Sequence, residues 1–505
     1  MVGGWSFFVG KFGVSGDLRR RMKPIFLRKK LGFGIYNDDR LLTMPGDPYL
    51  LLNILRRNQF RQKQQSSVDF AEKCFIMLYR SLIGGFGGFV MYYHRQLERK
   101  IIEVAREYAC ITLFGARQTG KSTMIRNLFP EYEYVTLDSS KERILATDDP
   151  ELFLNAHSTP LIIDEIQKAP NLMESIKMRI DEIKLKRVNE ETSLTLMYIL
   201  TGSNTHEIRE KASETLAGRT ALIEVNSLSE CEKLKTEGSE FVPDIEVLKR
   251  KQSMLVPKNR YEVFDEIFLG GMPEYWTLRP NRDTFFESYI ATYLEKDVSR
   301  MINVGRLDDF RKFMRIVALR TSQQLDYTEI GNAVGIDART AKNWISILES
   351  SGIVMILQPY ANNLSKRIIK SPKIYFMDTG LCAFLCGWTD SKIIESSSMS
   401  GSFFETYVVS EIVKSIRNSG KRIENTLYYY RDRDQKEVDL IFDINQKLYP
   451  IEIKKGIGKD KADKNFKILQ QYKMPIATGL IIDTSDRVFP LNKEAYYCPV
   501  GMIGL

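Results

Sequence analysis

The sequence of 505 residues predicts an α/β fold, in which a parallel sheet precedes two smaller modules. Three observations predict it. Short apolar runs in the first half end in glycine or polar residues, as buried parallel strands do. Residues 308–350 show the pattern of three consecutive helices, and two strand-like runs flank Asn445 and Gln446. At about 150 residues per domain, the length accommodates roughly three domains.

The composition is that of an ordinary globular protein, with 43% hydrophobic and 27% charged residues. It excludes a disordered chain, a collagen-like repeat and a disulfide scaffold. The six cysteines are scattered and too few to cross-link a chain of this length. Reduced thiols and a cytoplasmic location are therefore expected.

The net charge of +9 is confined to the N-terminal stretch. Residues 1–90 hold 15 Lys and Arg against 6 Asp and Glu, and 12 of the 32 glycines. Residues 91–505 are charge-balanced. Bulk charge therefore gives no support to a nucleic-acid partner for the rest of the chain.

Three interpretations of this basic, glycine-rich extension remain open. It could be a nucleic-acid arm, a membrane-surface anchor, or an upstream extension outside the functional protein. Its longest uninterrupted apolar run, Ser81–Tyr93, has 13 residues, short of the ~20 that span a bilayer, so no integral membrane segment is expected. From Met91 onward the chain resembles an amphipathic helix leading into a strand, and we favour Met91 as the natural start.

A phosphate-binding loop follows the first predicted strand, Ile111–Phe114. The sequence GARQTGKS directly after it fits the pattern G-x-x-x-x-G-K-[ST]. Its glycines let backbone N–H groups surround phosphate oxygens at a helix N-terminus. Lys121 would reach the β- and γ-phosphates, and Ser122 would ligate Mg²⁺. The residues expected to bind ATP are Gly115, Gln118, Thr119, Gly120, Lys121, Ser122 and Thr123.

Two acids end the next apolar run, Leu161–Ile163. Acidic side chains at the carboxyl end of a buried parallel strand emerge where ligands bind. We expect Asp164 to hold Mg²⁺ and Glu165 to orient the attacking water.

A third strand, Leu194–Leu200, ends in Thr-Gly-Ser-Asn. We expect Asn204 to hold the nucleophilic water or to contact the γ-phosphate. Arg219 is a candidate for stabilising transition-state charge, either within its own subunit or on a neighbour in a homo-oligomer. The alternative for Arg219 is a surface ion pair.

The motifs GARQTGKS, LIIDEIQKAP, LTGSN, LAGR and FLGGMPEYW together resemble those of the bacterial and archaeal AAA-like P-loop ATPases. In that family a winged helix and a restriction-endonuclease-like (PD-(D/E)xK) domain follow the ATPase domain. The resemblance covers about residues 91–505. It implies a P-loop domain at 91–225, a helical connector or lid at 226–305, a winged helix at 306–385 and a nuclease-like domain at 395–505.

The residue pattern of 308–350 is itself that of a winged helix. Helical runs at Asp308–Leu319, Tyr327–Val334 and Ala338–Ser350 precede two strand-like runs, with Asp337 as a predicted N-cap. Polar residues on the third helix and cations on the wing could bind DNA phosphates: Arg339, Lys342, Asn343, Lys366, Arg367 and Lys370. A purely structural or protein-binding module remains the alternative.

The two strand-like runs around Asn445 and Gln446 predict a hairpin whose paired residue numbers sum to 891. Asp439 would then lie opposite Glu452, and Lys454 would share their face. Facing carboxylates repel each other unless a divalent cation lies between them. Such a site would activate water, with Lys454 orienting it or stabilising charge.

The family resemblance adds Glu405, because a preceding helix often contributes a further acid in this fold. The expected metal ligands in the C-terminal region are therefore Glu405, Asp439 and Glu452. The sequence thus predicts an ATP-binding and ATP-hydrolysing, Mg²⁺-dependent protein that acts on or with nucleic acid, with DNA as the expected partner and metal-dependent nuclease activity in its last domain. The alternative is an ATP-driven switch whose C-terminal domains only bind DNA or protein.

Overall fold

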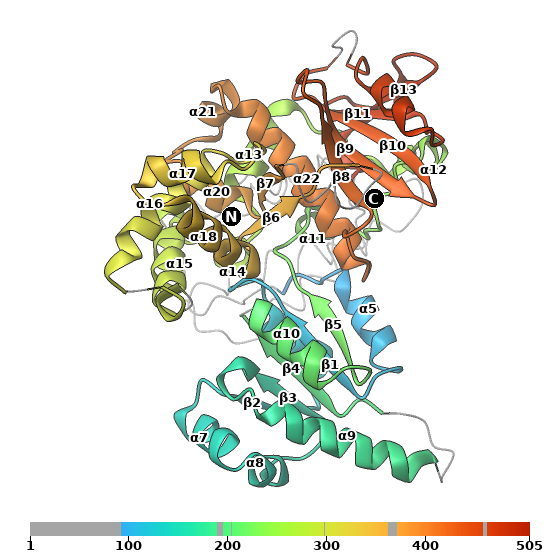
Figure 1. The fold of residues 1–505 in the computed structure, drawn as a ribbon. Coiled ribbons are helices and arrows are strands. Elements are labelled where there is room, and N and C mark those ends of the chain that lie inside the picture. Colours follow the sequence, from blue (N-terminus) through green and yellow to red (C-terminus); the bar gives the residue numbers. More distant parts are fainter. Residues whose placement is uncertain are drawn as a thin grey trace, which may run out of the picture. The chain divides into compact units, whose positions relative to one another are not determined.

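The first sheet is parallel throughout, as the sequence predicts. A computed structural model describes residues 92–188, 195–203, 205–296, 298–302, 304–361, 371–457 and 462–505. Five strands pair in the order β2-β3-β4-β1-β5 (Figure 1). They are β1 (Cys110–Phe114), β2 (Glu133–Thr136), β3 (Leu161–Asp164), β4 (Tyr198–Gly202) and β5 (Thr220–Glu224).

Both faces of this sheet are covered by helices because its strands are apolar on both sides. Leu161 and Ile163 of β3 face one hydrophobic cluster, whereas Ile162 faces another. The first cluster includes α9 (Leu172–Val188), and the second includes α5 (Leu97–Val104) and α6 (Lys121–Leu128). The remaining helices of this part are α7 (Ser140–Asp148), α8 (Pro150–Ala156) and α10 (Thr205–Thr215).

Five helices follow the sheet: α11 (Glu230–Leu234), α12 (Ile245–Lys251), α13 (Arg260–Leu269), α14 (Pro273–Leu278) and α15 (Arg282–Lys296). Two of them begin with a capping box. At α11, Ser229 and Glu232 satisfy each other's backbone N–H groups. At α13, Asn259 and Glu262 do the same.

The middle of the chain contains three helices and a small antiparallel sheet. The helices are α16 (Leu307–Ala318), α17 (Tyr327–Val334) and α18 (Ala338–Ser350), and β6 (Val354–Leu357) pairs with β7 (Lys373–Phe376). The predicted N-cap is confirmed, since the Asp337 carboxylate accepts from the backbone N–H of Thr340 at 2.9 Å. The predicted wing cations Lys366, Arg367 and Lys370 lie outside the described residues.

The last part is a six-stranded sheet beside a long helix, α22 (Ser400–Asn418). Two short helices, α20 (Thr379–Leu385) and α21 (Ser391–Ser396), lead into it. The strand order is β12-β13-β11-β10-β9-β8. The strands are β8 (Leu427–Arg431), β9 (Glu437–Ile444), β10 (Lys447–Ile453), β11 (Gly479–Asp483), β12 (Phe489–Pro490) and β13 (Ala495–Pro499).

The predicted hairpin register is confirmed. β9 and β10 are antiparallel, and the pairs run from Lys447 with Ile444 to Ile451 with Leu440, each summing to 891. Asn445 and Gln446 both have positive φ, 51° and 60°. This is the geometry of a two-residue turn that matches the twist of its strands.

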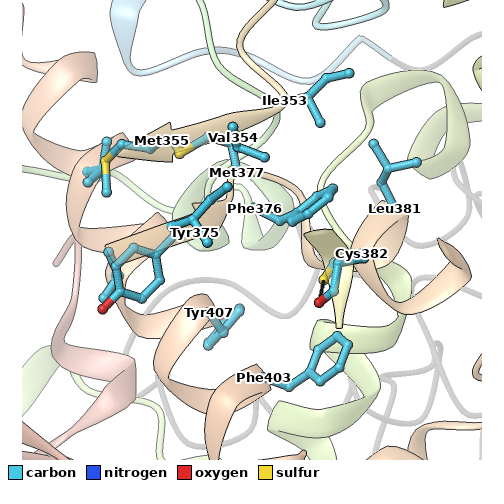
Figure 2. Close-up of a cluster of buried hydrophobic side chains, with 14 of the residues drawn as sticks. Ile353, Val354, Met355, Tyr375, Phe376, Met377, Leu381, Cys382, Phe403 and Tyr407 are labelled. Atoms are coloured by element: carbon cyan, nitrogen blue, oxygen red, sulfur yellow. Dashed lines mark hydrogen bonds between the residues drawn. The ribbon is translucent and has the colours of Figure 1, made fainter. Parts of the chain in front are cut away.

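The middle and last parts share one hydrophobic core. Figure 2 shows Tyr375 and Phe376 of β7 close to Phe403 and Tyr407 of α22, with Cys382 of α20 beside them. The same cluster continues into the strands of the last sheet. In the described ranges, no helix is both long and apolar enough to cross a membrane.

This shared core predicts that the two parts unfold together. Phe403 is fully buried, so Phe403→Ala should cost about 3–5 kcal/mol of unfolding free energy through lost burial and an unfilled cavity. Leu185→Ala, at a side chain that is 71% exposed, should stay within about 0.5 kcal/mol of the wild type. Urea unfolding followed by tryptophan fluorescence measures both. A separate transition for 306–385 with an unchanged midpoint would contradict the shared core.

Candidate functional site

The predicted phosphate loop lies at the carboxyl end of β1, and its backbone requires glycine. Gly115 has φ +147°, and a Cβ there would lie 2.2 Å from the carbonyl oxygen of Val225. Gly120, with φ +86°, is the N-cap of α6. Gln118 adopts φ 57° between them. The loop therefore turns tightly into a helix N-terminus, where backbone N–H groups favour an anion.

Lys121 lies across this loop. Its Nζ donates to the carbonyl oxygens of Gly115 at 2.9 Å and Ala116 at 2.7 Å. The Thr119 hydroxyl donates to the same Ala116 oxygen at 2.9 Å. The ammonium group is thus held at the mouth of the loop, within reach of a bound phosphate.

Asp164 is the centre of a second set of contacts. Its Oδ2 accepts from the Ser122 hydroxyl at 2.9 Å and from the Tyr134 hydroxyl at 2.6 Å, and its Oδ1 accepts from Thr201. Burial, together with the hydrogen bond to Asp164, raises the pKa of Tyr134. Ser122 and Asp164 therefore present oxygen atoms side by side, which suits Mg²⁺.

Glu165 lies directly after β3 in a left-handed conformation, with φ 61°. Its Oε2 accepts from the Gln167 amide and from the Ser203 hydroxyl, the latter at 3.3 Å. Ser203 and Gln167 were not predicted; Ser203 belongs to the same Thr-Gly-Ser-Asn motif that drew attention to its neighbour. Asn204 itself lies outside the described residues.

Arg219 is not near this loop within the subunit. It precedes Thr220, which pairs with Cys110 at the amino end of β1, whereas the loop follows the carboxyl end. Its guanidinium makes a two-pronged ion pair with Asp181 of α9, at 2.7 and 2.8 Å. The surface ion pair is thus what the structure shows, and the expectation of a charge-stabilising role in cis is wrong.

A pocket of about 270 Å³ lies over the loop. The predicted residues Gln118, Gly120, Lys121, Ser122 and Thr123 line it together with Arg117, Glu165 and Ser203. Tyr289 and Thr292 of α15 complete the lining. A helix outside the sheet therefore contributes to this pocket, which sequence motifs did not indicate.

The loop is also held from behind by Arg95, a buried residue that no motif singled out. Its guanidinium donates to the carbonyl oxygens of Thr119 at 2.8 Å and Asn226 at 2.7 Å. Its Nε ion-pairs with Glu232 of α11 at 3.1 Å. Both side chains of the pair are almost fully buried, at 3% and 1% exposed.

A second candidate site lies on the C-terminal hairpin. Lys454 Nζ contacts Glu452 Oε1 at 2.5 Å and Asp439 Oδ2 at 3.8 Å, so the three predicted side chains do meet. Burial and the charge of Asp439 raise the pKa of Glu452. Burial lowers the pKa of Lys454, but the two carboxylates outweigh it and the pKa is raised. Glu452 Oε2 is buried and has no hydrogen-bond partner among the described residues.

Glu405, the third expected ligand, lies close enough to Asp439 and Glu452 for their charges to interact, but its hydrogen bonds go to other residues. Its Oε1 accepts from Lys373 Nζ at 2.8 Å and from the Tyr375 hydroxyl at 2.7 Å. In the described part of the chain, no group of three or more His, Cys, Asp or Glu side chains is placed to hold a metal ion. The expected set of three carboxylate ligands is therefore not assembled, because a buried lysine occupies one of the three.

Comparison with known families concerns the domain that contains the first of these sites. Residues 107–234 match the AAA domain family. They form an AAA-type, ATPase-like domain. Residues 260–392 and 400–503 match two domains of unknown function, DUF8612 and DUF4143. Neither description names a winged helix or a nuclease fold.

Relatives extend beyond the AAA-type domain. Uncharacterized proteins of Mycobacterium bovis and Mycobacterium tuberculosis are each 27% identical over 398 residues, covering 78% of this chain and 80% of theirs. The Walker-type ATPase of Pyrococcus abyssi aligns with a TM-score of 0.36 and 15% identity, over 58% of this chain and 96% of its own. Cdc6p of Pyrobaculum aerophilum aligns with a TM-score of 0.22 and 12% identity, over 60% and 93%.

The contacts of Arg95 predict that the AAA-type domain depends on it. Arg95→Met would leave the Glu232 carboxylate buried without its ion-pair partner, at a cost of about 3–5 kcal/mol. It would also release the Thr119 carbonyl and weaken nucleotide binding. Arg99→Met, on the exposed face of α5, is the matched control. Thermal unfolding with and without a non-hydrolysable ATP analogue tests both; equal midpoints for the two variants would refute this role.

Proposed function

We propose that the protein binds ATP with Mg²⁺ and hydrolyses it. One observation carries the proposal: Lys121, Ser122 and Glu165 line a single pocket at the carboxyl ends of β1 and β3, and Asp164 contacts Ser122 there. The match of residues 107–234 to the AAA domain family supports it.

Each of these side chains has a distinct task. Lys121 would exchange the carbonyl oxygens of its own loop for phosphate oxygens, and Ser122 and Asp164 would hold Mg²⁺. When bound, Mg²⁺ neutralises charge on the phosphates. Glu165, positioned by Gln167 and Ser203, orients the attacking water, with Asn204 as a further water-holding group. A role for Arg219 is restricted to a neighbouring subunit.

Two substitutions separate binding from hydrolysis. Lys121→Ala should abolish hydrolysis and weaken ATP binding, because the phosphates lose their ammonium partner. Glu165→Gln should keep ATP binding but slow hydrolysis by about 10²–10⁴-fold. Phosphate release and a fluorescent ATP analogue measure the two properties.

The matched control for Lys121→Ala is Lys141→Ala, an exposed lysine on α7, which should leave both properties unchanged. Wild-type turnover by the Lys121→Ala protein would show that hydrolysis occurs elsewhere or comes from a contaminant.

For the C-terminal region we infer a metal-dependent nuclease, with 306–385 as a winged helix and 395–505 as a restriction-endonuclease-like domain. The supporting observation is the convergence of Asp439, Glu452 and Lys454 on one face of the hairpin. The orphaned, buried Glu452 Oε2 is an oxygen that a divalent cation would satisfy. Such a cation would activate water, while Lys454 would orient it or stabilise charge on a phosphate.

DNA is the expected substrate, with α18 as a phosphate-contacting surface. Arg339, Lys342 and Asn343 of this helix are all exposed. Side chains of these types can bind backbone phosphates, which position a protein on DNA without reading its sequence.

A nucleotide-driven switch that binds DNA or protein without cutting is the second candidate. The observation in its favour is that Lys373 already neutralises Glu405, one of the expected ligands. This alternative predicts ATP-dependent binding without strand breaks.

Incubation with plasmid DNA and Mg²⁺ or Mn²⁺, with and without ATP, distinguishes the candidates. The wild type and Asp434→Asn, which changes an exposed acid in the turn after β8, should nick or cut the plasmid. Asp439→Asn should lose the activity, since it removes an expected ligand. Cleavage by all three proteins would point to a contaminant, and cleavage by none would favour the switch.

A further inference from the structure

We propose that Lys373 takes the place of a second cation in the C-terminal acidic site. The site then holds one divalent metal ion, with Asp439 and Glu452 as its carboxylate ligands, and Glu405 is not a ligand. This inference rests on the proposed nuclease function insofar as it assumes that a metal ion binds there.

Lys373 comes from outside the C-terminal sheet. It is the first residue of β7, in the small sheet of the middle part, and is 2% exposed. Its Nζ contacts Glu405 of α22 at 2.8 Å and also Glu437 of β9. A buried ammonium is stable only when carboxylates surround it in this way. The middle part of the chain therefore supplies a fixed positive charge to the acidic site.

Glu405 is held by two neighbours that come from the same strand. Its Oε1 accepts from Lys373 and from the hydroxyl of Tyr375, two residues further along β7. Side chains two residues apart on a strand point to the same face, so Lys373 and Tyr375 both contact the Glu405 carboxylate from the same side. This arrangement gives Glu405 the environment of a counter-ion to Lys373.

The distribution of charge leaves one position for a metal ion. Glu437 is paired with Lys373 and, at 3.1 Å, with Arg431, and Glu405 is paired with Lys373. Asp439 and Glu452 make their direct ion pairs with Lys454, and Asp439 is also close enough to Lys373 for their charges to interact. With both carboxyl groups ionised, as ligands of a metal ion would be, Asp439, Glu452 and Lys454 carry a net charge of −1. One divalent cation would turn this into +1, the sign that attracts a phosphodiester.

The uncompensated oxygen lies in the same place. Glu452 is 7% exposed, and its Oε2 lacks a hydrogen-bond partner among the described residues. Asp439, also 7% exposed, accepts from the backbone N–H of Ile453 at 2.7 Å and is thereby fixed beside it. The oxygen without a hydrogen-bond partner therefore belongs to the pair Asp439 and Glu452, whereas the direct ion pairs of Lys373 are with Glu405 and Glu437.

Mn²⁺ binding to the nucleotide-free, full-length protein tests the ligand set. Isothermal titration should give one Mn²⁺ per wild-type chain. Asp439→Asn and Glu452→Gln should each weaken binding by about tenfold or more, since each removes a ligand. Glu405→Gln should change the affinity by about threefold at most, because only a compensated charge is lost. A loss in Glu405→Gln as large as in Asp439→Asn would overturn the proposal.

Substitutions at Lys373 test whether its ammonium group takes the place of a second metal ion. Lys373→Met should release the Glu405 carboxylate and raise the stoichiometry to two Mn²⁺, whereas Lys373→Arg should keep one. A folded Lys373→Met protein that still binds one Mn²⁺ with wild-type affinity would contradict the proposal. If Lys373→Met does not fold, the Mn²⁺ affinity of Glu405→Gln alone tests the proposal.

Failure of this inference is distinct from failure of the nuclease proposal. A wild-type protein that binds no Mn²⁺ at millimolar concentration would refute both. A wild-type protein that binds Mn²⁺ and cuts DNA, with Glu405→Gln unable to bind the ion, would refute only the role of Lys373.

Discussion

The shape of the phosphate loop depends on the buried guanidinium of Arg95. Glycines allow the loop to turn, but they do not fix it, and Arg95 binds the Thr119 carbonyl directly. The same group binds the chain after β5 at Asn226 and ion-pairs with Glu232 of α11. A buried charge is costly unless it is paired, so loss of the Arg95 guanidinium would remove all three contacts at once. The nucleotide site is therefore built on contacts that lie behind it.

Those contacts continue along α22. Glu411 accepts from the backbone N–H of Glu230 at 2.8 Å, and Lys414 donates to the Leu228 carbonyl at 3.2 Å. Arg417 ion-pairs at 2.6 Å with Glu224, the last residue of β5. Glu405 lies nearer the start of this same helix. One helix thus contacts the surroundings of the phosphate loop at one end and carries part of the acidic site at the other. Since packed interiors are stiff, the two sites share a rigid support.

Short sequence patterns predicted those features of the structure that neighbouring residues determine. The phosphate loop, Asp164 and Glu165 follow from short motifs, and the hairpin register follows from the strand period of two and a two-residue turn. Arg95 and Lys373 were missed because a single cation has no pattern of its own. The role of such a cation depends on partners that are distant in sequence, such as Glu232 for Arg95 and Glu405 for Lys373. Glu405 was predicted to be a metal ligand because the family resemblance does not reveal that Lys373 forms an ion pair with it.

The balance of charge in residues 91–505 also restricts how this part of the chain could attract nucleic acid. Attraction of nucleic acid to this part cannot come from excess Lys and Arg, so it must come from local arrangement. In the acidic site, the carboxylates would repel phosphate, and a divalent cation held by Asp439 and Glu452 would reverse the sign of the local charge. Lys373, buried and already paired with Glu405 and Glu437, cannot provide that reversal. Binding of the metal ion would therefore come before binding of the substrate, and α18 could hold DNA only by contacts outside this site.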